Sequence, residues 1–372
     1  MSATDTPIAA EPEVIAEVRG RAGFLTLNRP KALNALSLGM VRALTGWLLA
    51  WRDDPQVLAV AVRGAGRDGP FGAFCAGGDI RFLHRAGSQG DPALEDFFTE
   101  EYALDHLIHV YPKPYVAFMD GIVMGGGMGI GQGASRRIVT ERTKMAMPET
   151  AIGLFPDVGG GYFLSRTPGR VGEWLALTGE TIGGADALAY GLADAVVPSA
   201  DLPVLWDGLG AQDFAGAAAV EGWLAQHGDT AAGQGSAPRE RIDRFFALES
   251  VPATVAALER PDAGDWAHAT AAVLRKRSPL MLHVVLEQIR RARALDLAGD
   301  LRMERGLVRH CFFLRPGQSE TIEGIRALVV DKDHSPRWNP ARIEDVPAEA
   351  VAAFFASPWP AHAHPLRWLA GG

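Results

Sequence analysis

Short β-rich runs alternate with helix-like segments through the first 200 residues, and this alternation limits the fold more than any other feature of the chain. Val14 to Val18 and Phe24 to Leu27 flank a glycine turn, which predicts an antiparallel hairpin. The spacing of apolar residues beyond the hairpin predicts helices over 37–52 and 97–110 and strands over 57–62, 115–118 and 138–140. Alternating α and β elements predict a layered α/β architecture.

Strand signals fade after Pro198, and the domain organisation follows from this change. Residues 207–238 are rich in Ala and Gly and are expected to form a surface connection, whereas apolar residues at helical spacing return from Arg239 onward. A chain of 372 residues exceeds what one hydrophobic core usually supports. We therefore expect an N-terminal tail over 1–12, an α/β core over 13–238 and a helical C-terminal region over 239–372.

Composition excludes several classes of function. A formal charge of -8 with scattered basic residues argues against nucleic acid as a partner, and the charge-free stretch 121–135 is too short and too rich in glycine to cross a membrane. Cys75 and Cys311 lie far apart, so neither a disulfide framework nor a thiolate metal site is expected. The first 20 residues lack the pattern of a signal or transit peptide. These observations predict a cytoplasmic protein without a metal site.

Several common catalytic motifs are absent. No lysine precedes Ser or Thr, which excludes a Walker A loop, and neither GxSxG nor HExxH occurs. Residues 64–69 fit GxGxxG after a strand, but Pro70 stands where a nucleotide-binding helix should begin, so this match is weak. Any hydrolytic chemistry must then depend on carboxylates and backbone amides.

Two glycine-rich loops each link a strand to a helix, over Phe74–Ile80 and over Gly125–Gly127. Glycines allow close approach of a ligand to the backbone and leave amide N–H groups free to bind an anion. Two such loops can each give one N–H to a single oxygen, which is what an oxyanion hole requires. Tight turns with close helix packing would produce the same pattern.

The segment from Met147 to Gly161 carries Glu149 and Asp157 in otherwise apolar surroundings. Burial penalises ionised carboxylates, so they must be paired, hydrogen-bonded or functional. Each one alone would also fit at a helix N-terminus, and Glu101 would fit on a solvated helix face. Their occurrence together with the glycine loops favours a catalytic site.

Four segments together resemble the crotonase (enoyl-CoA hydratase/isomerase) superfamily: Asn28–Leu36, Phe74–Ile80, Asp120–Gly127 and Met147–Gly161. The block from Glu149 to Gly161 is similar to the 3-hydroxyisobutyryl-CoA hydrolase branch, as are Ile325–Ala327 and Asp331–Pro340. This resemblance implies a crotonase-like spiral of ββα units with a helical C-terminal region. It covers about residues 13 to 355.

One residue separates this branch from the hydratases of the superfamily. Hydratases carry a second catalytic glutamate three residues after the oxyanion-hole glycine, where this chain has Gly129. Glu149 matches the other hydratase glutamate, and Asp157 stands where the hydrolase branch has an acid and hydratases generally have none. The resemblance therefore implies thioester hydrolysis.

The resemblance also implies roles for individual residues. Glu149 and Asp157 would be catalytic, and Ala76 and Gly126 would form the oxyanion hole. Glu101 would bind substrate together with Gly126, Glu149 and Asp157. The residues expected to contact coenzyme A are Lys31, Ala32, Gly77 and Asp79. No cofactor is expected, because coenzyme A is part of the substrate.

Three activities remain open at this point. The first is hydrolysis of 3-hydroxyisobutyryl-CoA, with 3-hydroxypropionyl-CoA as a second substrate and Glu149 acting as nucleophile or as general base. The second is an enoyl-CoA hydratase or isomerase, and the third is a non-catalytic acyl-CoA binding protein. Crotonase relatives commonly form trimers or pairs of trimers, but the longer C-terminal region departs from the simple hydratase tail. A homo-oligomer is therefore possible, and the oligomeric state stays open.

Overall fold

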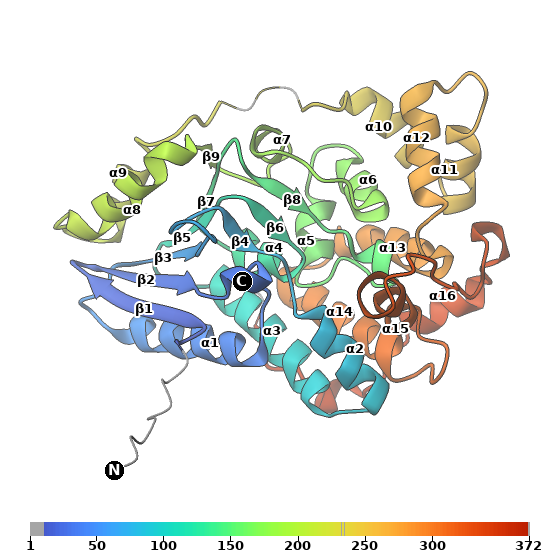
Figure 1. The fold of residues 1–372 in the computed structure, drawn as a ribbon, viewed down its shortest axis with the longest axis horizontal. Helices are drawn as coiled ribbons and strands as arrows, with labels where there is room; N and C mark the ends of the chain where they lie inside the picture. Colours follow the sequence, from blue (N-terminus) through green and yellow to red (C-terminus); the bar gives the residue numbers. More distant parts are fainter. Residues whose placement is uncertain (1–10, 232, 234, 371–372) are drawn as a thin grey trace, which may run out of the picture.

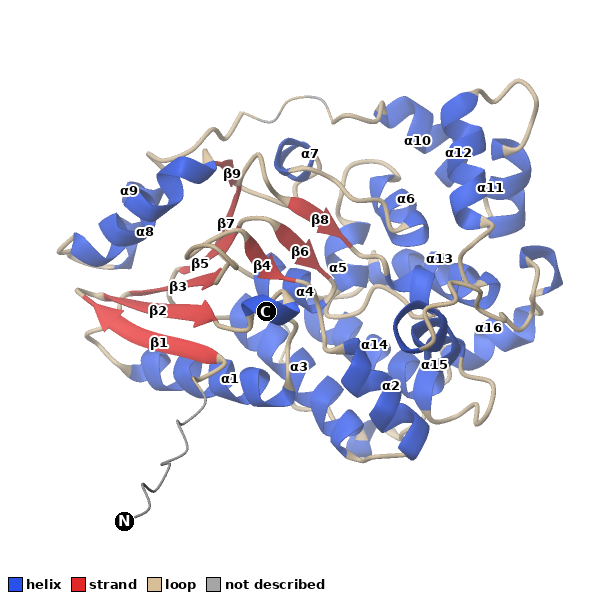
Figure 2. Cartoon of the chain, viewed as in Figure 1, coloured by secondary structure: helices blue, strands red, loops and turns tan. Residues whose placement is uncertain are grey.

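Nine strands form two sheets within residues 11–231, 233 and 235–370, the part of the chain that the computed structural model describes (Figures 1 and 2). The larger sheet has the strand order β1-β2-β3-β5-β7-β9, and the smaller has the order β4-β6-β8. The strands of the larger sheet are β1 (Val14–Arg19), β2 (Ala22–Leu27), β3 (Ala59–Gly64), β5 (Tyr115–Met119), β7 (Arg136–Val139) and β9 (Ala195–Val196). Those of the smaller sheet are β4 (Ala73–Cys75), β6 (Ile122–Met124) and β8 (Lys144–Ala146).

Successive strands from β3 onward alternate between the two sheets. β1 and β2 pair antiparallel as the predicted hairpin, and every other strand pairing within the two sheets is parallel. Each step from the larger to the smaller sheet is followed by helical structure, which is a spiral of ββα units. The predicted fold class is confirmed.

Helices surround both sheets and make up the C-terminal region. The helices up to residue 238 are α1 (Leu38–Asp53), α2 (Ile80–Gln89), α3 (Ala93–His109), α4 (Gly126–Gln132), α5 (Gly160–Ser165), α6 (Val171–Thr178), α7 (Gly184–Ala189), α8 (Leu202–Ala211) and α9 (Ala217–Leu224). Beyond it lie α10 (Arg239–Phe246), α11 (Val251–Leu258), α12 (Asp265–Leu274), α13 (Pro279–Ala292), α14 (Leu297–Phe312), α15 (Glu320–Ile325) and α16 (Ala348–Phe354).

Strands β2, β3 and β5 of the larger sheet are buried on both faces, as parallel strands usually are. Ala59 and Ala61 point to one face of β3, and Val60 and Val62 point to the other, because side chains alternate along a strand. The face with Val60 and Val62 belongs to the main core, which α1 and α3 share. The opposite face packs against α8 and α9, around the buried Trp206. The sheet is therefore a middle layer.

The expectation of a surface connection over 207–238 is wrong for its first part. Residues 207–211 lie in α8 and residues 217–224 form α9, and apolar residues of these two helices cover the sheet. Leu202, Leu205, Trp206 and Leu209 have the i, i+3, i+4, i+7 spacing of an amphipathic helix. The abundance of Ala and Gly in this stretch concealed that pattern.

The helical C-terminal region continues the main core. A single cluster of buried apolar side chains runs from Val14 in β1 to Leu369, and it includes residues of α13 and α14. The domain boundary near residue 238 stays a prediction, although the described residues beyond it form no strand. Among the described helices, none has both the length and the apolar character needed to span a membrane.

We expect Trp206→Ala to destabilise the protein by about 3 to 5 kcal/mol, the usual cost of removing a large buried aromatic side chain. Trp206 is 1% exposed, and its ring contacts those of Phe24 and Phe118 at centroid distances of 4.7 and 5.2 Å. Urea unfolding followed by circular dichroism would measure the loss. Trp368→Ala is the matched control, because Trp368 is 62% exposed and its removal should change stability by no more than about 0.5 kcal/mol. Equal effects of the two substitutions would contradict the assignment of α8 to the core.

Candidate active site

The first glycine loop follows β4 and leads into α2. The Ala76 N–H donates a hydrogen bond to the Leu33 carbonyl at 3.0 Å, so it is not free to bind a substrate oxygen. The prediction of Ala76 as an oxyanion-hole donor is therefore wrong. Gly77 has a φ of +104°, a conformation that favours glycine, and this turn redirects the amide groups that follow.

Gly78 has a free amide in this loop. Leu36 N–H donates to the Gly77 carbonyl at 2.8 Å, and Asp79 N–H donates to the Leu36 carbonyl at 3.0 Å. In this parallel bridge the flanking peptides face Leu36, so the N–H of Gly78 itself points away from it. Gly78 N–H donates to no described residue, and Gly78 lines a cavity. The sequence prediction selected Ala76 instead of Gly78, because residue type alone does not show which amide is already hydrogen-bonded within the protein.

The second glycine loop places another amide opposite Gly78, and the role of Gly126 as an oxyanion-hole donor stays a prediction. Gly126 is the first residue of α4, where N–H groups have no partner within the helix. A Cβ atom on Gly126 would lie 3.4 Å from the Gly78 nitrogen, so the two glycines border the same space. Together their amides can bind one oxygen at the N-terminus of a helix.

The run Gly125–Gly127 also leaves room for carboxyl groups. A Cβ atom on Gly125 would lie 2.8 Å from Glu149 Oε1, and one on Gly126 would lie 2.6 Å from Glu101 Oε1. A Cβ atom on Gly127 would lie 2.3 Å from the Cys75 carbonyl. Real Cβ contacts do not come this close, so no side chain is tolerated along the run without displacing its neighbours.

Glu149 begins a 3₁₀ turn, Glu149–Ile152, directly after Pro148. The side chain is buried, and its Oε2 accepts no hydrogen bond from a described residue. Burial, with a further contribution from nearby Asp157, raises the pKa of Glu149 well above its usual range. A buried carboxyl group with an uncommitted oxygen is suited to proton transfer or nucleophilic attack.

Asp157 lies on the segment between that turn and α5, and its side chain does not cap the helix. The Tyr102 hydroxyl donates a hydrogen bond to Asp157 Oδ2 at 2.8 Å. Burial raises the pKa of Asp157 to about 6, and the hydrogen bond from Tyr102 opposes this rise. Tyr102 comes from α3, one residue after Glu101, and sequence reasoning missed it.

Glu101 and Asp105 stand one turn apart on α3. Both side chains are buried, and neither Glu101 Oε1 nor either oxygen of Asp105 accepts a hydrogen bond from a described residue. Burial raises the pKa of each carboxyl well above its usual range, and the charge of Asp157 adds to the effect. Glu101 therefore belongs to the site rather than to a solvated face. Sequence reasoning missed Asp105, although the i, i+4 spacing from Glu101 was available as a signal.

Asp105 and Val158 fill the space beside Gly129. A Cβ atom on Gly129 would lie 2.7 Å from Val158 Cβ and 2.9 Å from Asp105 Oδ1. No larger residue fits there while these neighbours keep their places. The packing of α3 and the Asp157 segment against α4 thus leaves no room for the second hydratase glutamate at this position.

These groups meet in one cavity of about 160 Å³. Gly78, Gly126, Glu101, Glu149 and Asp157 all line it. Large apolar side chains form much of the remaining wall: Ile80, Leu83, Phe97, Phe98, Met124, Ile152, Leu154, Val158 and Leu328. Leu328 belongs to the C-terminal region, which sequence reasoning had not placed at the site.

The C-terminal helices hold the Asp157 segment in position. Glu304 on α14 accepts hydrogen bonds from Gly159 N–H at 2.8 Å and from Gly161 N–H at 3.0 Å. Gln288 on α13 donates to the Pro156 carbonyl at 2.7 Å. The backbone on both sides of Asp157 is therefore fixed by residues more than 120 positions away.

The residues predicted to contact coenzyme A are separated in the structure. Gly77 lines the cavity, whereas Lys31 and Ala32 are exposed on the short turn Pro30–Ala32. The Asp79 carboxylate caps α2 through Phe82 N–H and pairs with Arg29 at 3.2 Å, so its side chain serves the fold. Contact of these four residues with coenzyme A stays a prediction. No group of three His, Cys, Asp or Glu side chains in the described part is arranged to hold a metal ion.

Curated relatives resemble the chain over most of its length. A protein from Gallus gallus is 41% identical over 91% of this chain and 87% of its own length, and it is named 3-hydroxyisobutyryl-CoA hydrolase, mitochondrial. One from Arabidopsis thaliana, named 3-hydroxyisobutyryl-CoA hydrolase 1, is 40% identical over 94% of this chain and 92% of its own length. The name of the chicken relative contradicts the expectation of a cytoplasmic protein. That expectation rested partly on two unpaired cysteines, which fit any reducing compartment.

A solved structure from Mycobacterium thermoresistibile, named a carnitinyl-CoA dehydratase, matches the fold with a TM-score of 0.81. It is 40% identical in sequence and covers 92% of this chain and 96% of its own. The family model described as enoyl-CoA hydratase/isomerase matches residues 22–355. The chain therefore belongs to the enoyl-CoA hydratase/isomerase family, the crotonase superfamily.

Proposed function

We propose that this protein hydrolyses 3-hydroxyisobutyryl-CoA, an intermediate of valine breakdown, to 3-hydroxyisobutyrate and coenzyme A. The observation that carries the proposal is the pairing of buried Glu149 with buried, Tyr102-bonded Asp157 in a cavity lined by two glycine amides. The relatives named 3-hydroxyisobutyryl-CoA hydrolase support the choice of substrate.

The Gly78 and Gly126 amides bind the thioester carbonyl oxygen and stabilise the negative charge that develops on it. Loss of one such donor typically costs about 3 to 4 kcal/mol in the transition state. Gly126 adds the positive end of a short helix, which favours the same charge.

Glu149 supplies the base or the nucleophile. As a base it takes a proton from water, and the hydroxide adds to the carbonyl carbon as the carbon–sulfur bond breaks. As a nucleophile it forms a mixed anhydride and releases the thiolate, and water then cleaves the anhydride. Both routes yield the acid and coenzyme A, and both use water as the only other reactant, so neither needs a cofactor.

Asp157 orients the 3-hydroxyl group of the substrate. Because the Tyr102 hydroxyl donates to Oδ2 of Asp157, the other carboxylate oxygen is left to accept a hydrogen bond from the substrate hydroxyl. Glu101 lines the same polar end of the cavity. A site built to bond a hydroxyl discriminates against the analogue that lacks it.

Hydration of an enoyl-CoA is the second candidate, favoured by the family and by the name of the Mycobacterium structure. It needs a second acid near the glycine run, and the crowding around Gly129 leaves no room for one at that position. A non-catalytic acyl-CoA binding protein is the third candidate. It would not need a buried carboxyl group with an uncommitted oxygen.

We expect Glu149→Gln to lower kcat for release of coenzyme A by about 100- to 10,000-fold, because it removes the base or nucleophile and keeps the shape. KM should change much less. Thiol release measured with a chromogenic disulfide reports both constants. Glu349→Gln, at an exposed position, is the matched control and should leave both unchanged. Retention of wild-type kcat by Glu149→Gln would contradict the proposal.

Asp157→Asn should reduce the preference for 3-hydroxyisobutyryl-CoA over isobutyryl-CoA by about 10- to 100-fold, since a hydrogen bond to a charged group is lost. Tyr102→Phe should act in the same direction with a smaller effect, because it releases the Asp157 carboxylate from its partner. The ratio of kcat/KM for the two thioesters is the quantity to measure. An unchanged ratio in Asp157→Asn would refute its role in recognising the hydroxyl.

The value of kcat/KM should fall as the pH drops through about 6, the pKa of Asp157, instead of near 4, where exposed carboxyl groups titrate. Protonation removes the negative charges on which the chemistry depends, and the raised pKa of Glu149 acts in the same sense. Tyr102→Phe removes a hydrogen bond that lowers the pKa of Asp157, so the acidic limb should move to higher pH. A profile that stays flat down to pH 5 would be inconsistent with these buried acids acting in ionised form.

A further inference from the structure

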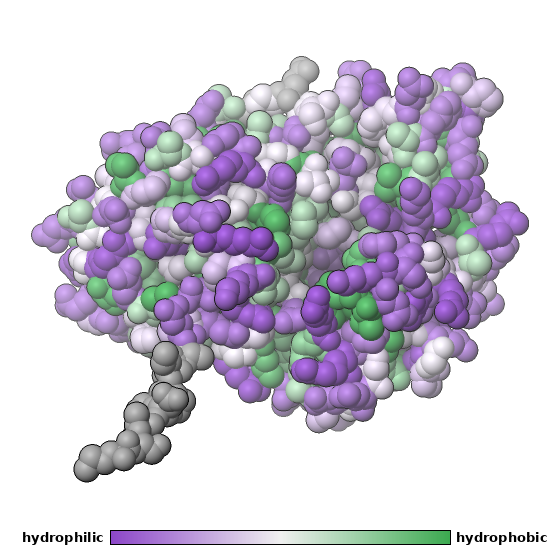
Figure 3. Space-filling model, in the orientation of Figure 1, coloured by the Kyte–Doolittle hydropathy of each residue, from purple (hydrophilic) through white to green (hydrophobic). Residues whose placement is uncertain are grey.

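Leu328 brings the C-terminal region into the wall of the catalytic cavity. It lines the cavity together with Ile80 and Leu83 of α2 and Ile152, yet its side chain is 41% exposed. A residue that both lines a cavity and faces solvent stands at the mouth. Apolar side chains gather on the surface where α15 and the following turn lie in Figure 1, as Figure 3 shows.

A π-helical turn, Arg326–Val330, carries Leu328. Such turns are rare and occur frequently at functional sites. Asp331 N–H donates to the Arg326 carbonyl at 2.8 Å, and His334 N–H donates to the Ala327 carbonyl at 3.0 Å. Lys332 and His334 follow with φ values of +58° and +52°, a region that non-glycine residues rarely occupy. Strain of this kind persists only where surrounding contacts impose it.

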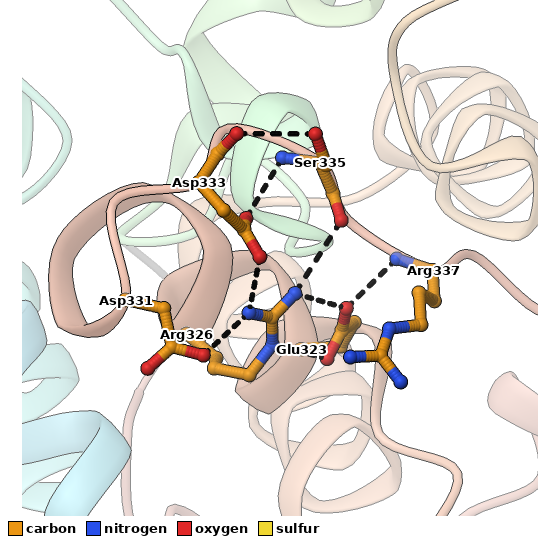
Figure 4. Close-up of polar contacts among 6 residues, drawn as sticks. All are labelled: Glu323, Arg326, Asp331, Asp333, Ser335 and Arg337. Atoms are coloured by element: carbon orange, nitrogen blue, oxygen red, sulfur yellow. Dashed lines mark hydrogen bonds and ion pairs between the residues drawn. The ribbon is translucent and has the colours of Figure 1, made fainter.

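The Arg326 cluster, which consists of Glu323, Arg326, Asp331 and Asp333, imposes that conformation (Figure 4). The guanidinium group donates twice to Glu323, at 2.8 Å each, and once to each aspartate, at 2.6 and 2.7 Å. Hydrogen bonds from Arg326 lower the pKa of Glu323 and of Asp333, so both acids stay ionised. One arginine thus holds the helix before the turn and the loop after it.

The turn is also fixed relative to the catalytic residues. Thr321 on α15 donates to the Gly153 carbonyl at 2.7 Å. A Cβ atom on Gly324 would lie 2.4 Å from the Ile152 backbone, so α15 packs directly against the turn that begins at Glu149. The position of Leu328 is therefore set with respect to Glu149.

We infer that Leu328 is a substrate-binding residue that packs against the pantetheine arm of coenzyme A, and that Arg326 is its positioning residue. The inference rests on the proposed function. The inner end of the cavity is polar, with Glu101, Glu149 and Asp157 buried there, and it takes the acyl group. The pantetheine arm of coenzyme A is longer than the acyl group and must extend out through the mouth, where Leu328 provides an apolar wall.

The test measures binding of two non-hydrolysable ligands by calorimetry, free coenzyme A and its S-isobutyl thioether. We expect Leu328→Ala to raise Kd for both ligands by the same factor, about five- to tenfold, because the lost contact is with the arm that they share. Val330→Ala is the matched control, since Val330 lies on the same turn, is 51% exposed and does not line the cavity. It should change Kd by less than about twofold.

Arg326→Gln should reproduce the rise in Kd without a loss of kcat. The double variant Leu328→Ala/Arg326→Gln should bind both ligands no more weakly than the single variants do. Non-additivity of this kind shows that one residue acts through the other. A general structural role for Arg326 would instead lower kcat and add to the effect of Leu328→Ala.

Two results would overturn the inference. In one, Leu328→Ala has no more effect than Val330→Ala, and in the other, only the thioether binds more weakly, which would place Leu328 against the acyl group. Thiol release, measured with the same wild-type preparation, distinguishes a failure of the proposed function from a failure of the inference about Leu328. A protein that binds both ligands but cleaves no thioester would refute the proposed function and not the contact with Leu328.

Discussion

The absence of side chains at Gly125–Gly127 is the constraint on which the rest of the site depends. Carboxyl oxygens of Glu101 and Glu149 lie where Cβ atoms on this run would have to go. The same glycines open α4 and leave the Gly126 amide free to bind an anion. Acids and amides can therefore approach one thioester from different sides. A single alanine in the run would displace either one of these buried carboxyl groups or the backbone of the neighbouring loop.

Burial raises the pKa of these acids, and the C-terminal region contributes to that burial. Carboxyl groups shielded from water have raised pKa values and are stronger bases once ionised. The C-terminal region supplies part of this shielding through Leu328, and it fixes the Asp157 segment through Glu304 and Gln288. Its helices share the main hydrophobic core with the α/β part. The C-terminal region is thus a structural component of the active site.

Much of this organisation could be predicted from the sequence, because it depends on local patterns. The hairpin and the alternation of strands and helices follow from periodicity. The presence of Glu149 and Asp157 in one cavity follows from motifs on a contiguous segment, whereas Glu101 was placed there only by the family resemblance. The rest depends on contacts between distant residues. The use of the Ala76 amide by Leu33, the hydrogen bond from Tyr102 to Asp157 and the place of Leu328 cannot be read from spacing. Helices α8 and α9 were missed because small residues weakened their apolar pattern.

The most direct test compares two reactions of the wild-type enzyme, thiol release from 3-hydroxyisobutyryl-CoA and hydration of crotonyl-CoA followed by absorbance. The structure argues against hydration, because the crowding around Gly129 leaves no room there for the second acid that hydration requires. We expect rapid thiol release and no measurable hydration. Hydration without thiol release would contradict the account, since the enzyme would then add water to an alkene instead of cleaving a thioester.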